Sequence, residues 1–130
     1  MCGIVGYTGD QQAAPILLAG LEKLEYRGYD SAGLAVRDGE NTPEVVKAKG
    51  RLRALAEKTD NGRAMQGNCG IGHTRWATHG EPSENNAHPH CTDDRNVVAV
   101  HNGIIENYQE IREKLVKCGY TFYSDTDTEV

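Results

Sequence analysis

Glycine is the residue type that most constrains how this chain folds. The sequence has 15 glycines against only 4 prolines, and the glycines recur along its whole length. Because glycine ends helices and permits tight turns, this spacing predicts many tight turns rather than a flexible linker. At 130 residues the chain is long enough for one hydrophobic core and too short for two ordinary domains. We therefore expect a single domain of short, closely connected elements.

Apolar periodicity predicts which elements these are. Strands are expected at 2–9, 32–36, 45–48, 70–74, 97–101 and 120–123, and helices at 12–25, 51–58 and 108–118. Pro15 fits only in the first turn of its helix, and Gly28 stands where a glycine that ends a helix is expected. Between 76 and 94 the periodicity disappears, which predicts a long loop of the kind that carries function.

The end of the chain has the pattern of a helix start. Thr126 and Glu129 form the Thr-x-x-Glu capping box, in which each side chain pairs with a backbone donor. Barely one turn fits before Val130, and an isolated turn is not stable. We therefore expect residues 1–130 to be the N-terminal part of a longer protein.

Charge and composition exclude several classes of partner. The net charge is -5, the basic residues are scattered, and no apolar run is long enough to span a membrane or act as a signal peptide. The four cysteines are too few for a disulfide scaffold. We expect a cytoplasmic protein with reduced thiols that binds neither nucleic acid nor membrane.

Cys2 is the candidate nucleophile. Removal of Met1 would place a thiol and a free α-amine on the same residue. A thiol titrates near ~8.5 and needs a base, and an α-amine with a pKa of ~7.7 to 8.0 is a base poised near working pH. From position alone, the alternative is that Cys2 is a small buried hydrophobe near the chain start.

Three groups of motifs resemble one family. They lie at 2–6 with 24–33, at 72–80, and at 86–90 with 101–107. Together they resemble the N-terminal glutaminase domain of the glutamine:fructose-6-phosphate aminotransferases, and the resemblance covers the chain from Cys2 to Val130. Amidophosphoribosyltransferases and asparagine synthetases look similar at the N-terminal Cys-Gly-Ile and at an Arg-Gly-x-Asp segment. The segment 73–79 is most similar to that of the sugar-phosphate enzymes.

The resemblance implies a fold and an activity. The fold is the α+β fold of the N-terminal nucleophile (Ntn) hydrolases, two antiparallel sheets stacked between helical layers, truncated here to the first part of a class II glutaminase domain. The activity is hydrolysis of the L-glutamine amide, which supplies ammonia to a fructose 6-phosphate site on a domain absent from residues 1–130. The resemblance also implies a homo-oligomer at full length and no cofactor.

The resemblance assigns catalytic roles to named residues. Cys2 attacks the glutamine amide and forms a thioester. The side chain of Asn102 and the backbone N–H of Gly103 stabilise the oxyanion. Arg27 and Gly28 support the nucleophile, the first as a nearby cation and the second by allowing close backbone approach. The dipeptide Asn102-Gly103 alone is equally typical of a hairpin turn.

Recognition of glutamine needs one charge of each sign. Arg75 and Asp127 are expected to bind its α-carboxylate and α-ammonium, and arginine fixes a carboxylate through two parallel hydrogen bonds. Trp76, Thr78 and His79 are expected in the loop that covers glutamine. Without this context, Arg75 would be read as a solvated surface charge, Asp127 as a helix N-cap and Trp76 as a core residue.

Other histidines and cysteines raise the question of a metal site. Cys69-x3-His73 and His88-x-His90 match none of the common zinc spacings. We expect hydrogen-bonded structural histidines, His101 among them, and no metal. Two other functions stay open: a class II amidotransferase with another acceptor, such as phosphoribosyl diphosphate, or a non-catalytic binding or zinc module in which Cys2 is inert.

Overall fold

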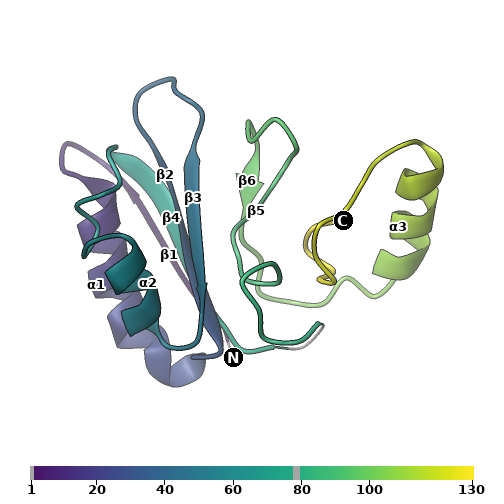
Figure 1. Ribbon diagram of the computed structural model, residues 1–130, viewed down its shortest axis with the longest axis horizontal. Helices are drawn as coiled ribbons and strands as arrows, with labels where there is room; N and C mark the ends of the chain where they lie inside the picture. The colour runs from purple at the N-terminus through teal and green to yellow at the C-terminus, as the bar shows by residue number, and fades with distance from the viewer. Residues whose placement is uncertain (1, 78–79) are drawn as a thin grey trace.

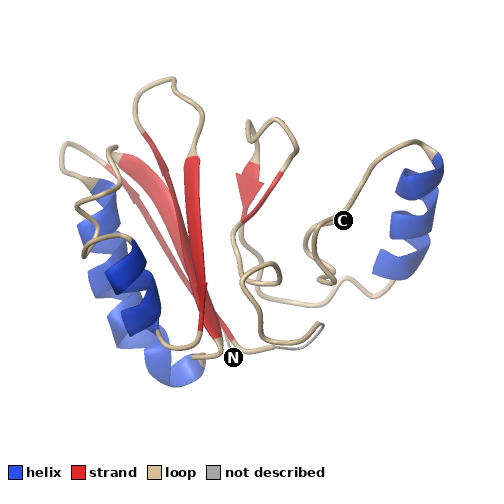
Figure 2. Ribbon diagram, in the orientation of Figure 1, coloured by secondary structure: helices blue, strands red, loops and turns tan. Residues whose placement is uncertain are grey.

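A computed structural model describes residues 2–77 and 80–130 (Figure 1). The elements follow in the order β1 (Gly3–Thr8), α1 (Ala13–Leu24), the 3-10 turn η1 (Glu25–Arg27), β2 (Ser31–Arg37), β3 (Glu44–Lys49), α2 (Leu52–Lys58), β4 (Cys69–Arg75), β5 (His90–Cys91), β6 (Val98–Ala99) and α3 (Tyr108–Lys117). Figure 2 shows how strands and helices separate into layers.

The main sheet has four strands in the order β1-β4-β2-β3, and every pairing is antiparallel. The strand β4 lies in its interior, where Gly3 of β1 pairs with Thr74 and Gly33 of β2 pairs with His73. Side chains alternate between the two faces of a strand, so His73 and Arg75 share one face and Thr74 points to the other. This register decides which β4 side chains face the candidate site.

Helices α1 and α2 cover one face of the main sheet (Figure 1). The fully buried side chains of this layer include Leu17, Leu21, Leu34 and Leu55. Gly72 of β4 lets α1 approach closely, because a Cβ there would lie 2.9 Å from Leu21 Cδ1. Burial of apolar surface between helix and sheet, at roughly 25 cal/mol per Å², is what holds these two layers together.

The other face of the main sheet carries the loop after β4 and the small sheet formed by β5 and β6. Gly33 makes room for this loop, since a Cβ at that position would lie 2.0 Å from the carbonyl oxygen of His88. Helix α3 lies beyond the small sheet, and none of its ten described residues is buried. The layers therefore run helices, four-stranded sheet, two-stranded sheet, helix.

Most of the predicted elements are confirmed, and four differ. The segment 76–94, predicted as a loop, contains the two-residue strand β5. The strand predicted at 97–101 is only Val98–Ala99, and the strand predicted at 120–123 is wrong. The capping box predicted from Thr126 and Glu129 is also wrong: the Glu129 carboxylate accepts hydrogen bonds from the backbone N–H groups of Tyr123 and Ser124 at 2.8 and 2.7 Å, and the N–H of Thr126 donates to Ser124 Oγ instead. Gly28 ends η1 with an extended φ of -172°.

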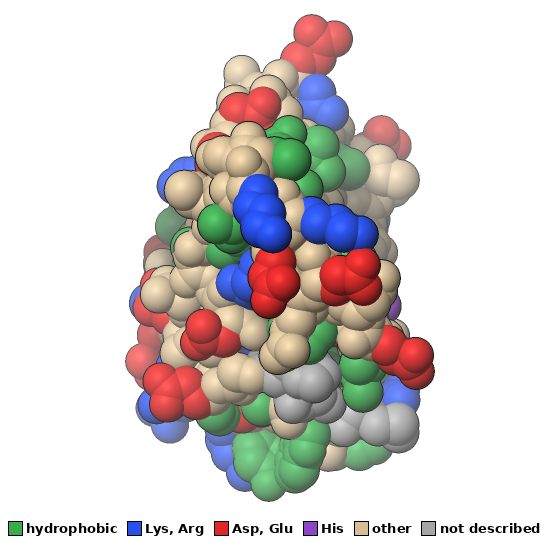
Figure 3. All heavy atoms as spheres, turned by 90° about the vertical axis from the view of Figure 1, so that its right-hand side faces the viewer, with side chains coloured by type: hydrophobic (Ala, Val, Ile, Leu, Met, Phe, Trp, Pro, Cys, Tyr) green, Lys and Arg blue, Asp and Glu red, His purple; other side chains and the backbone are tan. Residues whose placement is uncertain are grey.

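Figure 3 shows the face of the molecule that carries α3, where acidic and basic side chains are interspersed. One ion pair on α3 joins Lys114 to Glu110 at 2.8 Å. The guanidinium of Arg112 lies 4.6 Å from the centre of the Phe122 ring. Within residues 2–77 and 80–130, no helix is both long and apolar enough to cross a membrane.

Candidate active site

The structure brings most of the predicted site residues to one cavity of about 550 Å³. Its lining includes Cys2, Arg27, Arg75, Trp76, Asn102, Gly103 and Asp127. These residues come from the start of β1, the end of η1, the end of β4, the loop after β6 and the C-terminal turn. Thr78 and His79, which were also predicted here, lie outside the described residues.

Cys2 lies immediately before β1, and β1 pairs with β4. This pairing brings the thiol to the end of β4, where the backbone N–H of Trp76 donates a hydrogen bond to Cys2 Sγ at 3.2 Å. The Trp76 side chain is 48% exposed and meets the ring of Tyr29 edge-on at 5.5 Å, so it is not a core residue. An indole at the mouth of the cavity beside the thiol is placed to contact a bound molecule.

Asn102 and Gly103 lie in the loop between β6 and α3. They do not connect two paired strands, so the hairpin alternative is wrong. Asn102 Nδ2 donates a hydrogen bond to the carbonyl oxygen of Cys2 at 2.9 Å. A primary amide has two N–H hydrogens, so the bond to Cys2 leaves one of them unused on a side chain that lines the cavity. The arrangement places a neutral donor next to the nucleophile.

Arg75, the last residue of β4, is only 3% exposed, which excludes the reading of a solvated surface charge. Its Nη1 donates to the carbonyl oxygen of Glu81 at 3.2 Å and its Nη2 to that of Gly80 at 3.1 Å. These backbone carbonyls hold the guanidinium in a fixed position. The cavity therefore has a fixed positive charge in its wall.

Asp127 supplies a negative charge to the same cavity. It is 4% exposed, and its Oδ2 accepts a hydrogen bond from the backbone N–H of Ile105 at 2.7 Å. The carboxylate is not used as an N-cap: it binds the loop that follows Gly103, and the turn Asp127–Val130 is closed by the Val130 N–H, which donates to the Asp127 carbonyl oxygen at 3.2 Å. The bond joins the C-terminal turn to the loop that carries Asn102.

Gly28 does not line the cavity but packs directly behind it. A Cβ at this position would lie 2.8 Å from the carbonyl carbon of Arg75 and 3.0 Å from the backbone nitrogen of Trp76. Asp30, whose contribution the sequence did not reveal, fixes the same segment: its N–H donates to the Arg75 carbonyl at 3.2 Å, and its carboxylate accepts from the N–H of Ala77. The signal that points to Asp30 is its place in the Arg-Gly-x-Asp segment.

Three buried histidines lie at the site, and one of them, His88, lines the cavity. His73 stacks on His88 with ring centres 4.2 Å apart, and His88 contacts His90 at 4.6 Å. Burial lowers the pKa of His73 to about 4, that of His88 to about 2 and that of His90 to about 3, so all three rings are neutral at pH 7. Among the described residues, no group of three potential ligands is arranged to hold a metal ion.

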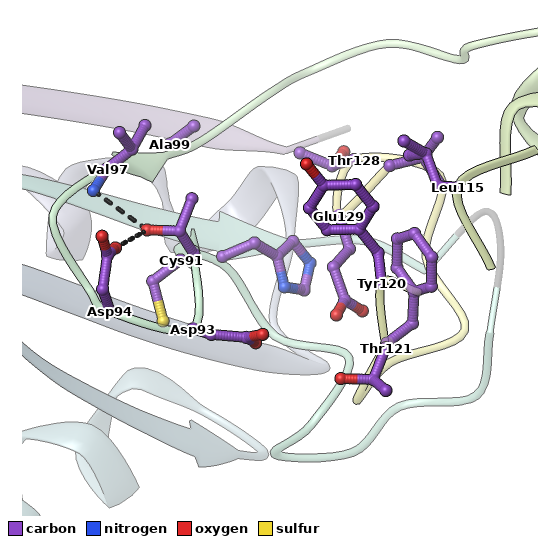
Figure 4. Close-up of a pocket in the computed structure, with 14 residues that line it drawn as sticks. Cys91, Asp93, Asp94, Val97, Ala99, Leu115, Tyr120, Thr121, Thr128 and Glu129 are labelled. Atoms are coloured by element: carbon purple, nitrogen blue, oxygen red, sulfur yellow. Dashed lines mark hydrogen bonds between the residues drawn. The ribbon is translucent and has the colours of Figure 1, made fainter. Parts of the chain in front are cut away.

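A larger cavity, of about 690 Å³, lies between the small sheet and the C-terminal segment (Figure 4). Figure 4 shows Val97 and Ala99 on one side and Leu115 and Tyr120 on the other. Its lining contains none of the residues predicted for the site. The smaller cavity is therefore the candidate active site, because it holds the thiol, both buried charges and the amide donor.

Comparison with protein families places this arrangement in a known class. Residues 38–130 match the glutamine amidotransferase domain model, and the chain belongs to that family. Within the family, it is 58% identical over 130 residues to the glutamine–fructose-6-phosphate aminotransferase (isomerizing) of Caldanaerobacter subterraneus subsp. tengcongensis, and 60% identical to that of Clostridium tetani. The match covers all of this chain and 21% of each relative.

Solved structures confirm the fold class. The chain is similar to the glutamine phosphoribosylpyrophosphate amidotransferase of B. subtilis, with a TM-score of 0.80 and 27% identity, covering 99% of this chain and 28% of that one. A structure described as the allosteric regulatory enzyme of purine biosynthesis matches with a TM-score of 0.81 and 30% identity over the same shares. The chain has the predicted α+β fold of the Ntn hydrolases.

Proposed function

We propose that this chain is the glutaminase part of an enzyme that transfers the amide nitrogen of glutamine to fructose 6-phosphate. One observation carries the proposal: Cys2, Asn102, Arg75 and Asp127 line a single cavity although they are far apart in the sequence. A nucleophile, an amide donor and one buried charge of each sign are what hydrolysis of an amino-acid amide requires.

In the proposed reaction, Cys2 Sγ bonds to the side-chain amide carbon of glutamine, and the carbonyl oxygen becomes an oxyanion. The α-amine of Cys2, free once Met1 is removed, takes the thiol proton and passes it to the leaving nitrogen. The carbon–nitrogen bond then breaks and ammonia departs, which leaves a glutamyl thioester. Water hydrolyses the thioester to glutamate and restores the thiol, so no oxidant or cofactor is consumed.

Asn102 and Gly103 are the proposed oxyanion donors. Asn102 lies at the nucleophile, since its Nδ2 already donates to the Cys2 carbonyl at 2.9 Å. Both residues line the cavity, and the Gly103 backbone N–H is the second proposed donor. Donors preplaced where charge develops are worth about 10²- to 10³-fold in rate each.

Arg75 and Asp127 are the proposed recognition pair, Arg75 for the α-carboxylate and Asp127 for the α-ammonium of glutamine. Both are almost fully buried, and hydrogen bonds with backbone groups hold each charge in the cavity wall. A zwitterionic ligand supplies both opposite charges at once. We assign Trp76, Thr78 and His79 to the loop that covers glutamine, and Arg27 and Gly28 to support of the nucleophile.

The acceptor site belongs to the part of the enzyme that this chain does not span. The chain covers about a fifth of the length of the curated relatives it matches, and these are glutamine–fructose-6-phosphate aminotransferases. Identity of 58–60% to them, against 27% to the phosphoribosylpyrophosphate amidotransferase, favours fructose 6-phosphate as acceptor. We further propose a homo-oligomer in the cytoplasm, where free cysteines such as the four described here stay reduced.

Two measurements test the proposal. Intact mass should show that Met1 is removed, and Cys2→Ala should abolish release of glutamate and ammonia from glutamine. Cys118→Ala is the matched control, because Cys118 is an exposed free thiol at the end of α3 and should retain activity. Retention of Met1, or undiminished hydrolysis by Cys2→Ala, would refute the mechanism. Product formation with phosphoribosyl diphosphate but not with fructose 6-phosphate would refute the acceptor.

A further inference from the structure

His73 is the buried residue closest to the catalytic groups that the proposed reaction does not use. It lies in β4, between β1 and β2, and is 0% exposed. Its Nε2 is 3.0 Å from Oδ1 of Asn102, and Nδ2 of the same amide donates to the carbonyl oxygen of Cys2 at 2.9 Å. His73, Asn102 and Cys2 therefore form a continuous chain of hydrogen bonds that ends at the nucleophile.

The donor and the acceptor of each of these two hydrogen bonds follow from the chemistry of the groups at their ends. The Cys2 carbonyl can only accept, so the amide nitrogen of Asn102 must face it and Oδ1 must face His73. Because Oδ1 also only accepts, His73 Nε2 must carry the proton. Nδ1 is then unprotonated, and it has no hydrogen-bond partner within the described part of the chain. One tautomer of His73 and one orientation of Asn102 satisfy the geometry.

Packing holds the His73 ring in this position. The ring stacks on that of His88 at 4.2 Å with an interplanar angle of 17°. His90 continues the array, and it is anchored by Tyr123 Oη at 2.8 Å from its Nδ1 and by Thr126 Oγ1 at 2.8 Å from its Nε2. A stacked ring in the interior of a four-stranded sheet cannot turn without disturbing its neighbours. The donor that meets Asn102 is therefore fixed by the rigid part of the fold.

We propose that His73 is a positioning residue for the oxyanion donor: its neutral imidazole donates Nε2–H to Asn102 Oδ1 and so holds the second amide hydrogen of Asn102 toward the cavity beside Cys2. This inference rests on the proposed glutaminase reaction and deepens it. The hydrogen bond also polarises the amide, which strengthens Nδ2 as a donor when negative charge develops. Asn102 itself is an exposed loop residue, whereas His73 is buried in β4, so the hydrogen bond ties the Asn102 amide to the main sheet.

A double-mutant cycle in the protein at its full natural length tests the inference. His73→Leu should lower kcat for glutamine hydrolysis by about 10- to 100-fold, less than the roughly 10²- to 10³-fold expected for loss of the oxyanion donor itself, and should change KM less than about threefold. Asn102→Ala should lower kcat by at least as much. The double variant should be no slower than Asn102→Ala alone, because His73 acts only through Asn102. The control cycle of Arg75→Lys with Asn102→Ala should instead show multiplied effects on kcat/KM, since the proposed role of Arg75 is to bind the α-carboxylate and not the oxyanion.

Two polar variants keep the test decisive if His73→Leu does not fold. The amide nitrogen of Gln reaches the position of imidazole Nε2, whereas that of Asn reaches only the position of Nδ1. His73→Gln should therefore retain kcat about tenfold better than His73→Asn at equal thermal stability. Multiplied effects in the His73 cycle, or equal kcat for the Gln and Asn variants, would overturn the inference. Hydrolysis by the wild type and its loss in Cys2→Ala test the proposed function separately.

Discussion

Mild acid should unfold this domain through its buried histidines. His73, His88 and His90 have pKa values lowered from 6.5 to about 4, 2 and 3, in each case chiefly because burial penalises the charged ring. In the unfolded chain the same rings regain a pKa near ~6.5 and bind protons as the pH falls. The native state does not bind them until the pH reaches the lowered values. Stability from these groups is therefore present above pH ~6.5 and lost as the pH falls toward 4.

The size of the effect follows from the proton count. Between pH 7 and 5 each ring lowers the free energy of unfolding by about 2 kcal/mol, so the three rings together lower it by about 5 to 6 kcal/mol. Below pH ~6 the slope approaches about 4 kcal/mol per pH unit, three times the ~1.4 kcal/mol of one proton. Domains have total stabilities of roughly 5–15 kcal/mol, so this loss is a large fraction of the whole.

Urea denaturation between pH 7 and 5 measures this loss, followed by the fluorescence of Trp76, the only tryptophan of the chain. His88→Gln removes one of the three rings and should reduce the slope by about a third. A decline smaller than about 2 kcal/mol across this range would refute the reasoning. So would histidine NMR resonances of the folded chain that titrate near ~6.5 for the three buried rings.

Three further predictions concern single contacts. Gly33→Ala should destabilise the domain by at least about 1–3 kcal/mol in urea titrations, because a Cβ would lie 2.0 Å from the His88 carbonyl oxygen, and an unchanged midpoint would contradict this close approach. Tyr123→Phe should cost about 1–3 kcal/mol by the same assay, since it removes the hydroxyl 2.8 Å from His90 Nδ1, and a neutral effect would show that the hydroxyl is dispensable. Arg75→Lys should raise KM for glutamine by roughly tenfold or more, because lysine cannot reproduce the planar guanidinium, and an unchanged KM in steady-state kinetics would remove Arg75 from the recognition pair.

The sequence predicts the main sheet and its helices well because their patterns are local. The apolar repeat of α1 and the buried run of β2 each specify an element and the face that packs. The segment 120–123 has the composition of a strand but pairs with none, since the Tyr123 N–H donates to the Glu129 side chain. A pattern of β-forming residues cannot show whether a partner strand lies within reach.

The sequence predicts which residues form the site. It does not predict the contacts between distant segments that bring these residues together. Cys2 and Trp76 are joined through β1–β4 pairing, and Asp127 reaches Ile105 across 22 positions. Spacing in the sequence reveals neither contact. His73 was not predicted as part of the site, although it precedes Arg75 by two residues and alternation puts both on one face of β4. That period of two is the signal that would have found it.

The β1–β4 pairing has a consequence for how the chain tolerates insertions and deletions. Gly3 pairs with Thr74 in an antiparallel register, so Cys2, one residue before Gly3, and Arg75, one residue after Thr74, lie at the same end of the strand pair. Adding or removing one residue inside either strand would reverse the faces of the side chains beyond it. The connection between β2 and β3 carries no such constraint, because residues 38–43 contribute nothing to the cavity. Insertions and deletions should therefore be tolerated in that connection but not within β1 or β4.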